Sequence, residues 1–139
     1  MRFFLDANVI FAAAYNEGGV CRALFQLAEA NLCELVASSF ATDEARRNLA
    51  TKSPASLGAL AALLRQMSLV GEPAPAFVAT VSAAALPAKD APILAAAAAN
   101  RCTVLVTGDR RHFGHLYGRS IAGVRVATPS EALALLLPD

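Results

Sequence analysis

The chain has 139 residues, 56% of them hydrophobic, which is enough for one ordinary core and short for two. Its formal net charge of +1 gives no overall electrostatic preference for nucleic acid or for a membrane surface. No apolar stretch reaches the roughly 20 residues of a membrane span, so we expect a single domain over residues 1–139 and no membrane partner.

Strand and helix patterns alternate from the N-terminus onward. Short apolar runs predict strands at residues 2–5, 33–38 and 67–71. Periodic apolar residues predict a helix that begins near Asp6 and further helices at residues 19–31, 40–50 and 53–66. The stretch 73–87 mixes β-branched residues with alanines and prolines, so a strand and a short helix both remain open there.

The hydrophobic pattern is clearer after residue 90. It predicts helices at residues 90–101 and 129–137 and strands at residues 102–107 and 121–127. The 102–107 run is continuously apolar, which is typical of a sheet covered on both faces. Strands alternating with helices predict an α/β fold, with a parallel sheet between two layers of helices.

The three cysteines, Cys21, Cys33 and Cys102, are widely spaced and surrounded by apolar residues. They form neither a disulfide framework nor a zinc-binding pattern, and they predict buried thiols in a reducing compartment. Asp6 and Asn8 interrupt the apolar N-terminus and leave too short a run for a signal peptide. We therefore expect a cytoplasmic protein.

Acidic residues follow the predicted strands. Asp6 ends the first strand, Asp109 ends the 102–107 strand, and Asp90 opens the helix that leads into it, whereas Glu44 lies in the helix after the second strand. Ligands of open parallel sheets bind at the carboxyl ends of the strands, where these aspartates are expected. Each aspartate is also explained as a helix N-cap, and Glu44 as a solvated helix residue, and these roles do not exclude a shared site.

Four converging carboxylates would repel one another unless a cation lay between them. A hard divalent ion such as Mg²⁺ prefers oxygen ligands, can lower the pKa of a bound water and can stabilise charge on a phosphoryl oxygen. This chemistry predicts phosphodiester hydrolysis. His112 and His115 form a loop pair that is more typical of a surface than of a metal site.

The charges are also distributed unevenly. Residues 1–44 contain six acidic residues and two arginines, and residues 101–125 contain five arginines and one aspartate. If the fold brings these regions together, an acidic pocket would lie beside a basic rim, which suits an anionic substrate. Dispersed surface charge is the simpler alternative.

Three stretches, "FFLDANVIFAA", "ASSFATDEARRNL" and "KDAPILAAAAANRCTVLVTGDRRHFG", resemble the PIN domain family in order and spacing. The resemblance implies a three-layer α/β sandwich with a five-stranded parallel sheet of order 3-2-1-4-5. It also implies a metal-dependent ribonuclease, often the VapC-type toxin of a type II toxin–antitoxin pair.

By position, the family's catalytic acids, which hold Mg²⁺ or Mn²⁺, correspond to Asp6, Glu44, Asp90 and Asp109. Asn8 matches the polar residue that supports the first aspartate, and Thr107 matches the hydroxyl two residues before the last aspartate. Both are short hydrogen-bonding side chains able to orient a carboxylate. For Asn8, a local bond to the helix N-terminus is the alternative.

Two departures from the family pattern stand out. Ala7 occupies a position that is often threonine, which removes a hydroxyl but no ligand. His112 and Phe113 stand where many members carry a further acidic residue, so the resemblance does not imply a second metal.

Cations follow the last aspartate directly. Arg110, Arg111 and His112 are candidates for contacts with RNA phosphates, since cations beside a metal site position the anionic backbone. A solvated turn is the alternative for both arginines.

Other functions are alternatives to the nuclease. A receiver-type signalling domain needs an adjacent acidic pair near the N-terminus and a lysine at the end of the last strand. Asp6 has no acidic neighbour, and the last strand ends without a lysine. A PIN fold kept only for binding RNA or a partner, or a nuclease that processes RNA, remains open. The toxin alternative implies an antitoxin partner, and two apolar helix faces, "ALFQLAEA" and "LGALAALL", could serve that partner or a homodimer, or simply the core.

Overall fold

The computed structural model describes residues 1–82 and 91–137. The strands are β1 (Arg2–Leu5), β2 (Glu34–Ser38), β3 (Met67–Val70), β4 (Val104–Val106), β5 (Ser120–Ile121) and β6 (Val124–Ala127). The α-helices are α1 (Ala7–Tyr15), α2 (Val20–Glu29), α3 (Ser39–Lys52), α4 (Leu57–Leu64), α5 (Pro75–Ser82), α6 (Ala91–Ala99), α7 (Arg110–Phe113) and α8 (Pro129–Leu136). Short 3₁₀ turns at Pro54–Ser56 and Gly114–Leu116 precede α4 and follow α7.

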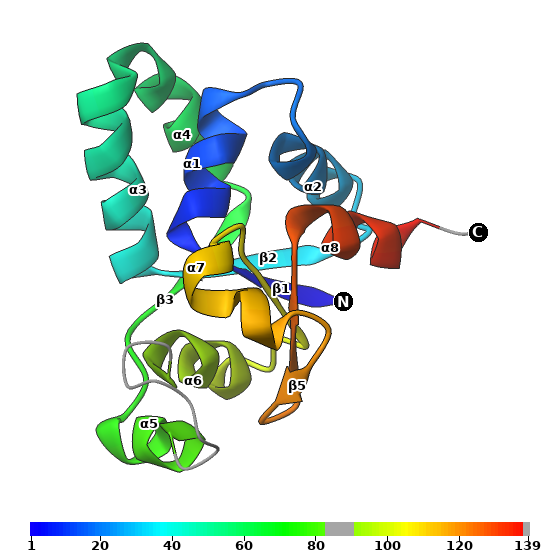
Figure 1. The fold of residues 1–139 in the computed structure, drawn as a ribbon. Coiled ribbons are helices and arrows are strands. Elements are labelled where there is room, and N and C mark those ends of the chain that lie inside the picture. Colours follow the sequence, from blue (N-terminus) through cyan, green and yellow to red (C-terminus); the bar gives the residue numbers. More distant parts are fainter. Residues whose placement is uncertain (83–90, 138–139) are drawn as a thin grey trace.

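The strands form one sheet of order β3-β2-β1-β4-β6-β5 (Figure 1). The first five strands in this order are parallel, and they reproduce the expected 3-2-1-4-5 arrangement with β6 as the fifth strand. The α/β fold class is therefore confirmed, with one correction. The sheet has a sixth, antiparallel strand, β5, at its edge.

The extra strand arises inside the segment expected to be a single strand, residues 121–127. Ala122 and Gly123 both have positive φ, at 53° and 81°, which is the backbone conformation of a tight two-residue hairpin turn. The chain reverses there, so Ser120–Ile121 pairs with the beginning of β6. Apolar residues stand on both sides of this turn, and Gly123 is the one turn-forming residue within it.

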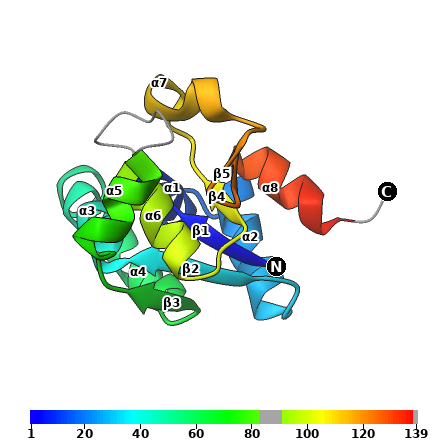
Figure 2. The ribbon, with the colours of Figure 1, turned by 90° about the horizontal axis from the view of Figure 1, so that it is seen from below.

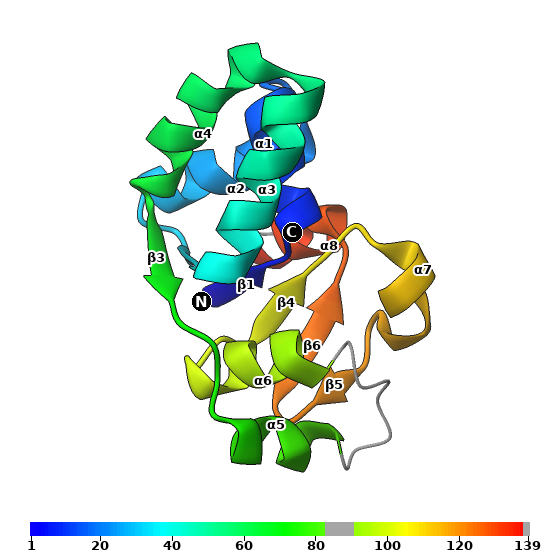
Figure 3. The same ribbon diagram turned by 90° about the vertical axis from the view of Figure 1, so that its left-hand side faces the viewer.

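Helices cover both faces of the sheet, as Figure 3 shows, with α1 to α4 on one side and α5 and α6 on the other. Neighbouring residues of β1 divide between the two layers, because side chains alternate across a strand. Phe3 packs in the core with α1, α2, α3 and α8, and Phe4 packs in the core with α6. Both phenylalanines are fully buried.

Within the layers, α8 packs against α2 and α5 packs against α6 (Figure 2). The segment left open between strand and helix contains a helix, α5, in its described part. Among residues 1–82 and 91–137, no helix has both the length and the apolar character needed to cross a bilayer.

The parallel strands bring four chain segments to one edge of the sheet. Asp6 follows β1, Ser38 ends β2, Thr107 follows β4 and Thr128 follows β6. Backbone hydrogen bonds continue past the strands there, from Asp6 N–H to the Val106 carbonyl at 3.0 Å and from Thr107 N–H to the Ala127 carbonyl at 3.0 Å. The carboxyl edge of the sheet is thus a fixed platform for polar side chains.

Candidate functional site

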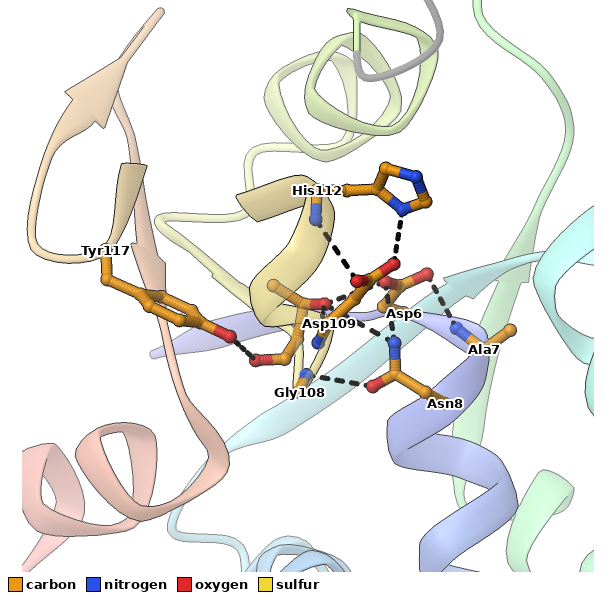
Figure 4. A network of polar contacts seen from close by, with 8 residues as sticks. Asp6, Ala7, Asn8, Gly108, Asp109, His112 and Tyr117 are labelled. Atoms are coloured by element: carbon orange, nitrogen blue, oxygen red, sulfur yellow. Dashed lines mark hydrogen bonds and ion pairs between the residues drawn. The ribbon is translucent and has the colours of Figure 1, made fainter. Parts of the chain in front are cut away.

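Asp6 is the N-cap of α1 and also the most heavily hydrogen-bonded acid at this edge. Its Oδ1 accepts from the Ala7 N–H at 2.8 Å, and its Oδ2 accepts from the Thr107 hydroxyl at 2.8 Å and from Asn8 Nδ2 at 3.0 Å (Figure 4). The N-cap alternative is therefore correct for Asp6. It leaves the carboxylate at the pocket described below, so both roles are available to it.

Asn8 and Thr107 join α1 to the segment after β4. Asn8 Oδ1 accepts from the Gly108 N–H at 2.8 Å, and the Thr107 hydroxyl accepts from the Asp109 N–H at 3.1 Å. A Cβ on Gly108 would lie 3.3 Å from Asn8 Oδ1, so the absence of a side chain permits this close approach. Thr107 is fully buried, and its hydroxyl bonds to both aspartates.

Asp109 is the N-cap of α7. Its Oδ1 accepts from the His112 N–H at 3.2 Å, and its Oδ2 pairs with His112 Nδ1 at 2.5 Å (Figure 4). His112, expected from the sequence to contact RNA, thus lies against the acidic centre itself.

The pKa values of the two aspartates are shifted in opposite directions. Burial raises the pKa of the Asp6 carboxyl, and the nearby Asp109 charge adds to this rise, while hydrogen bonds from Thr107 and Ala7 offset part of it. Burial also acts to raise the pKa of Asp109, but the side-chain and backbone hydrogen bonds of His112 outweigh it and lower that pKa. A cation between them would favour the charged form of Asp6.

Glu44 reaches the same place from α3. Asp6, Glu44 and Asp109 line a cavity of about 320 Å³, and the same three acids line a second cavity of about 320 Å³. The first cavity has apolar walls from Phe40, Ile93 and Phe113. The acids thus lie where the two cavities meet, and the structure brings together three of the four predicted acidic residues.

The fourth predicted acid, Asp90, lies outside the described residues. Among the described residues of α6, Pro92, Ile93 and Ala96 line the first cavity.

Glu72 is an acidic residue of this cavity that sequence reasoning missed. It follows β3, which ends at Val70, and it therefore lies at the same edge of the sheet as Asp6 and Asp109. Like those two aspartates, Glu72 is an acid that follows a predicted strand, and this sequence signal could have identified it.

Arg110 and Arg111 are exposed on α7, beside Asp109. Neither takes part in an ion pair with another of the described residues. Their guanidinium groups are therefore available to an anion that approaches the acids.

The donor atoms of the site are the carboxylate oxygens that a hard divalent cation prefers. In the described ranges, no three acidic, histidine or cysteine side chains stand close enough to form a complete metal cage. Mg²⁺ does not need one, because it keeps several waters and is held by one or two carboxylates together with substrate phosphates. Asp6 and Glu44 have no ion-pair partner within residues 1–82 and 91–137, so the all-oxygen set fits such an ion.

Fold and site define a class: an α/β protein whose parallel sheet gathers carboxylates at its carboxyl edge. Residues 2–111 match the PIN domain family, and the chain belongs to this family. The family resemblance read from the sequence is thereby confirmed. No curated protein matches the sequence.

Solved structures share the fold at low sequence identity. VapBC2 from Rickettsia felis, bound to a DNA fragment from its promoter, is similar with a TM-score of 0.67 and 16% identity, over 92% of this chain and 98% of the other. PAE2754 from Pyrobaculum aerophilum is similar with a TM-score of 0.66 and 18% identity, over 98% of this chain and 95% of the other. FitAB bound to an IR36 DNA fragment is similar with a TM-score of 0.62 and 19% identity, over 91% and 94%.

Proposed function

We propose that this PIN domain is a divalent-metal-dependent endoribonuclease that hydrolyses RNA phosphodiester bonds. The observation that carries the proposal is the meeting of Asp6, Glu44 and Asp109 at one pocket on the carboxyl edge of the sheet. Membership of the PIN family supports it, since the sequence resemblance implies this activity. The chain would act as a single nuclease domain.

In this proposal Asp6, Glu44, Asp90 and Asp109 hold Mg²⁺ or Mn²⁺ and are the catalytic residues. Asp90 enters on the sequence resemblance alone. When bound, the ion would lower the pKa of a coordinated water and stabilise negative charge on the phosphoryl oxygens.

The chain's own residues have three tasks around that ion. Thr107 and Asn8 hold the Asp6 carboxylate in one orientation through their hydrogen bonds to Oδ2. His112 holds Asp109 through Nδ1 and stands beside the substrate. Arg110 and Arg111, both exposed, bind RNA phosphates and position the backbone over the acids.

The biological setting we propose is a toxin–antitoxin pair. The sequence resembles the VapC kind of toxin, and the fold is similar to those of VapBC2 and FitAB. A cognate antitoxin is therefore the expected protein partner, with a homodimer as a second assembly. The unpaired, buried state of Cys21, Cys33 and Cys102 suits a cytoplasmic location.

The test is cleavage of a panel of structured RNAs by the purified protein with Mg²⁺, with Mn²⁺ and with EDTA. We expect cleavage that requires metal and that falls at least about 100-fold in Asp6→Asn, Glu44→Gln and Asp109→Asn. Asp43→Asn is the matched control for Glu44→Gln, because Asp43 is the preceding residue of α3 and pairs with Arg46 away from the two cavities.

Cleavage that persists in EDTA, or that survives all three substitutions, would overturn the metal-dependent mechanism. No cleavage of any RNA by folded protein with bound metal would favour a fold retained for binding. Growth arrest on expression, relieved in Asp109→Asn, is expected of a toxin and not of an RNA-processing enzyme.

A further inference from the structure

A second row of side chains leads away from the acids along two neighbouring helices. Helices α1 and α3 both begin at the carboxyl edge of the sheet and run side by side in the same direction (Figures 1 and 3). The cavity on this side of the acids is lined by Asn8 and Phe11 from α1, and by Asn48 and Lys52 from α3.

The far end of this row carries stacked aromatic rings and a cation. The rings of Phe11 and Tyr15 stack with centroids 5.7 Å apart and an interplanar angle of 20°. Lys52 Nζ lies 5.6 Å from the centre of the Phe11 ring. Tyr15 is 59% exposed, so much of this side chain is accessible to solvent.

The chemistry of this face changes in a regular order with distance from the acids. Carboxylates come first, then the amides of Asn8 and Asn48, and then a ring pair with an ammonium group. Asn8 and Tyr15 are seven residues apart on α1, which corresponds to about 10 Å along a helix. We call the surface formed by Phe11, Tyr15, Asn48 and Lys52 the α1–α3 face.

We propose that the α1–α3 face binds single-stranded RNA immediately to one side of the phosphate that is cleaved. An exposed base stacks on the ring of Tyr15, the Lys52 ammonium contacts a backbone phosphate, and the Asn48 amide is available to a base edge. This inference rests on the proposed ribonuclease, since it takes the acids as the cleavage point.

Two features favour RNA over a protein segment as the occupant. The face is continuous with the acidic centre, because Asp6, Glu44 and Asp109 line the same cavity as Lys52. The face is also polar apart from the stacked rings, whereas an amphipathic peptide helix needs a hydrophobic groove. Stacking rings interleaved with a cation are typical of sequence-tolerant binding to single strands.

The test is a binding titration of a fluorescein-labelled single-stranded RNA oligonucleotide, followed by fluorescence anisotropy in EDTA so that binding is read without turnover. We expect Tyr15→Ala and Lys52→Gln each to weaken binding about tenfold. Lys52→Gln should also make the plot of log K against log salt less steep, by the amount that corresponds to the loss of about one phosphate contact.

Two control variants isolate the proposed contacts. Tyr15→Phe keeps the ring and should bind within about twofold of the unmodified protein. Arg65→Gln removes an exposed positive charge just before β3, at the opposite edge of the sheet, and should also bind within about twofold.

The outcomes separate this inference from the nuclease proposal. Unchanged RNA binding in Tyr15→Ala and Lys52→Gln, in a protein that cleaves RNA, overturns RNA binding by the α1–α3 face and leaves the nuclease proposal intact. A protein partner would then be the alternative occupant of the face. The expected losses of binding in a protein that cleaves nothing uphold the face and overturn the nuclease. Absence of RNA binding by the unmodified protein in EDTA overturns the α1–α3 face alone, because cleavage with Mg²⁺ or Mn²⁺ tests the nuclease separately.

Discussion

Thr107 is the residue that joins the two aspartates of the candidate site. Its hydroxyl donates to Asp6 Oδ2 at 2.8 Å and accepts from the Asp109 N–H at 3.1 Å, and the side chain is fully buried. A buried hydroxyl with both partners in place is costly to remove, because the partners then lose a hydrogen bond without gaining water.

We predict that Thr107→Val lowers the free energy of unfolding by about 1–3 kcal/mol. It should weaken Mn²⁺ binding by about 10- to 100-fold, since the Asp6 carboxylate loses the bond that orients it. Urea denaturation measures the first effect and a metal titration the second. Thr107→Ser keeps the hydroxyl and should recover most of the metal affinity. Equal metal binding by the valine and serine variants would contradict an orienting role.

The pairing of His112 with Asp109 predicts a dependence of stability on pH in the metal-free protein. The folded-state pKa of Asp109 is lowered below its ordinary value of 3.8, mainly because the bonds from His112 outweigh the effect of burial. A carboxyl with a lowered pKa contributes stability above its unfolded pKa, and this contribution is lost as the pH falls through the folded value.

His112→Ala should therefore flatten the loss of stability that accompanies acidification below about pH 4. Urea denaturation of metal-free protein between about pH 6 and pH 3 measures it. His115→Ala is the matched control, because His115 is an exposed histidine three residues further along. Parallel curves for the unmodified protein and His112→Ala would show that the pair does not stabilise the native state.

At the scale of the elements, helix starts determine where the acids lie. Asp6 caps α1, Asp109 caps α7, and Ser38 caps α3 by accepting from the Ala41 N–H at 3.0 Å. Glu44 lies in the second turn of α3, so its position depends on how that helix begins. Ser38 and Ala41 line the same cavity as Glu44, which makes the cap part of the cavity wall.

Ser38→Ala is expected to lower the free energy of unfolding by about 1 kcal/mol, because the first turn of α3 loses its side-chain acceptor. Ser38→Gly should lower the free energy of unfolding by only a few tenths of a kcal/mol, since glycine is a tolerated N-cap. Urea denaturation of the two variants compares them. A cost for alanine no greater than for glycine would argue that the cap contributes little here.

The hydrophobic pattern of the sequence could predict some of the helices and strands but not others. The start of helix α1 and the bounds of the continuously apolar strand β4 were predicted to within a few residues, because their hydrophobic patterns are clear. The β5–β6 hairpin was not, because its turn consists of only two residues, Ala122 and Gly123, between apolar residues that together resemble one strand. Helix α5 stayed ambiguous because its β-branched residues and its alanines favour different structures.

At the scale of the whole molecule, the uneven charge distribution is only partly concentrated at the site. Asp6 and Glu44 do meet the arginine-rich segment around Asp109. However, Arg2 pairs with Glu34 at 2.5 Å near Arg101, and these residues lie at the amino edge of the sheet. The charged residues of these two segments therefore lie at both the amino and the carboxyl edge of the sheet, and not at the site alone.

Metal binding should couple the site to the stability of the entire fold. An ion that binds only the native state stabilises it by about 2.7 kcal/mol at a hundredfold excess over its Kd. We therefore expect Mn²⁺ to raise the Tm of the unmodified protein, and not that of the Asp6→Asn, Asp109→Asn double variant. Thermal denaturation with and without EDTA measures it. A Tm that rises equally in both proteins would indicate binding elsewhere.

The sequence by itself determined the five parallel strands, most helices, the family and the placement of Asp6 and Asp109. A residue that directly follows a parallel strand must lie at the carboxyl edge, so its position needs no knowledge of packing. The family resemblance had assigned Glu44 to the site, but only the tertiary structure placed Glu44 and Lys52 in one cavity with the two aspartates. Only the tertiary structure paired His112 with Asp109. A helix can rotate and tilt against its neighbours, so the direction of its side chains is decided by packing and not by spacing along the chain.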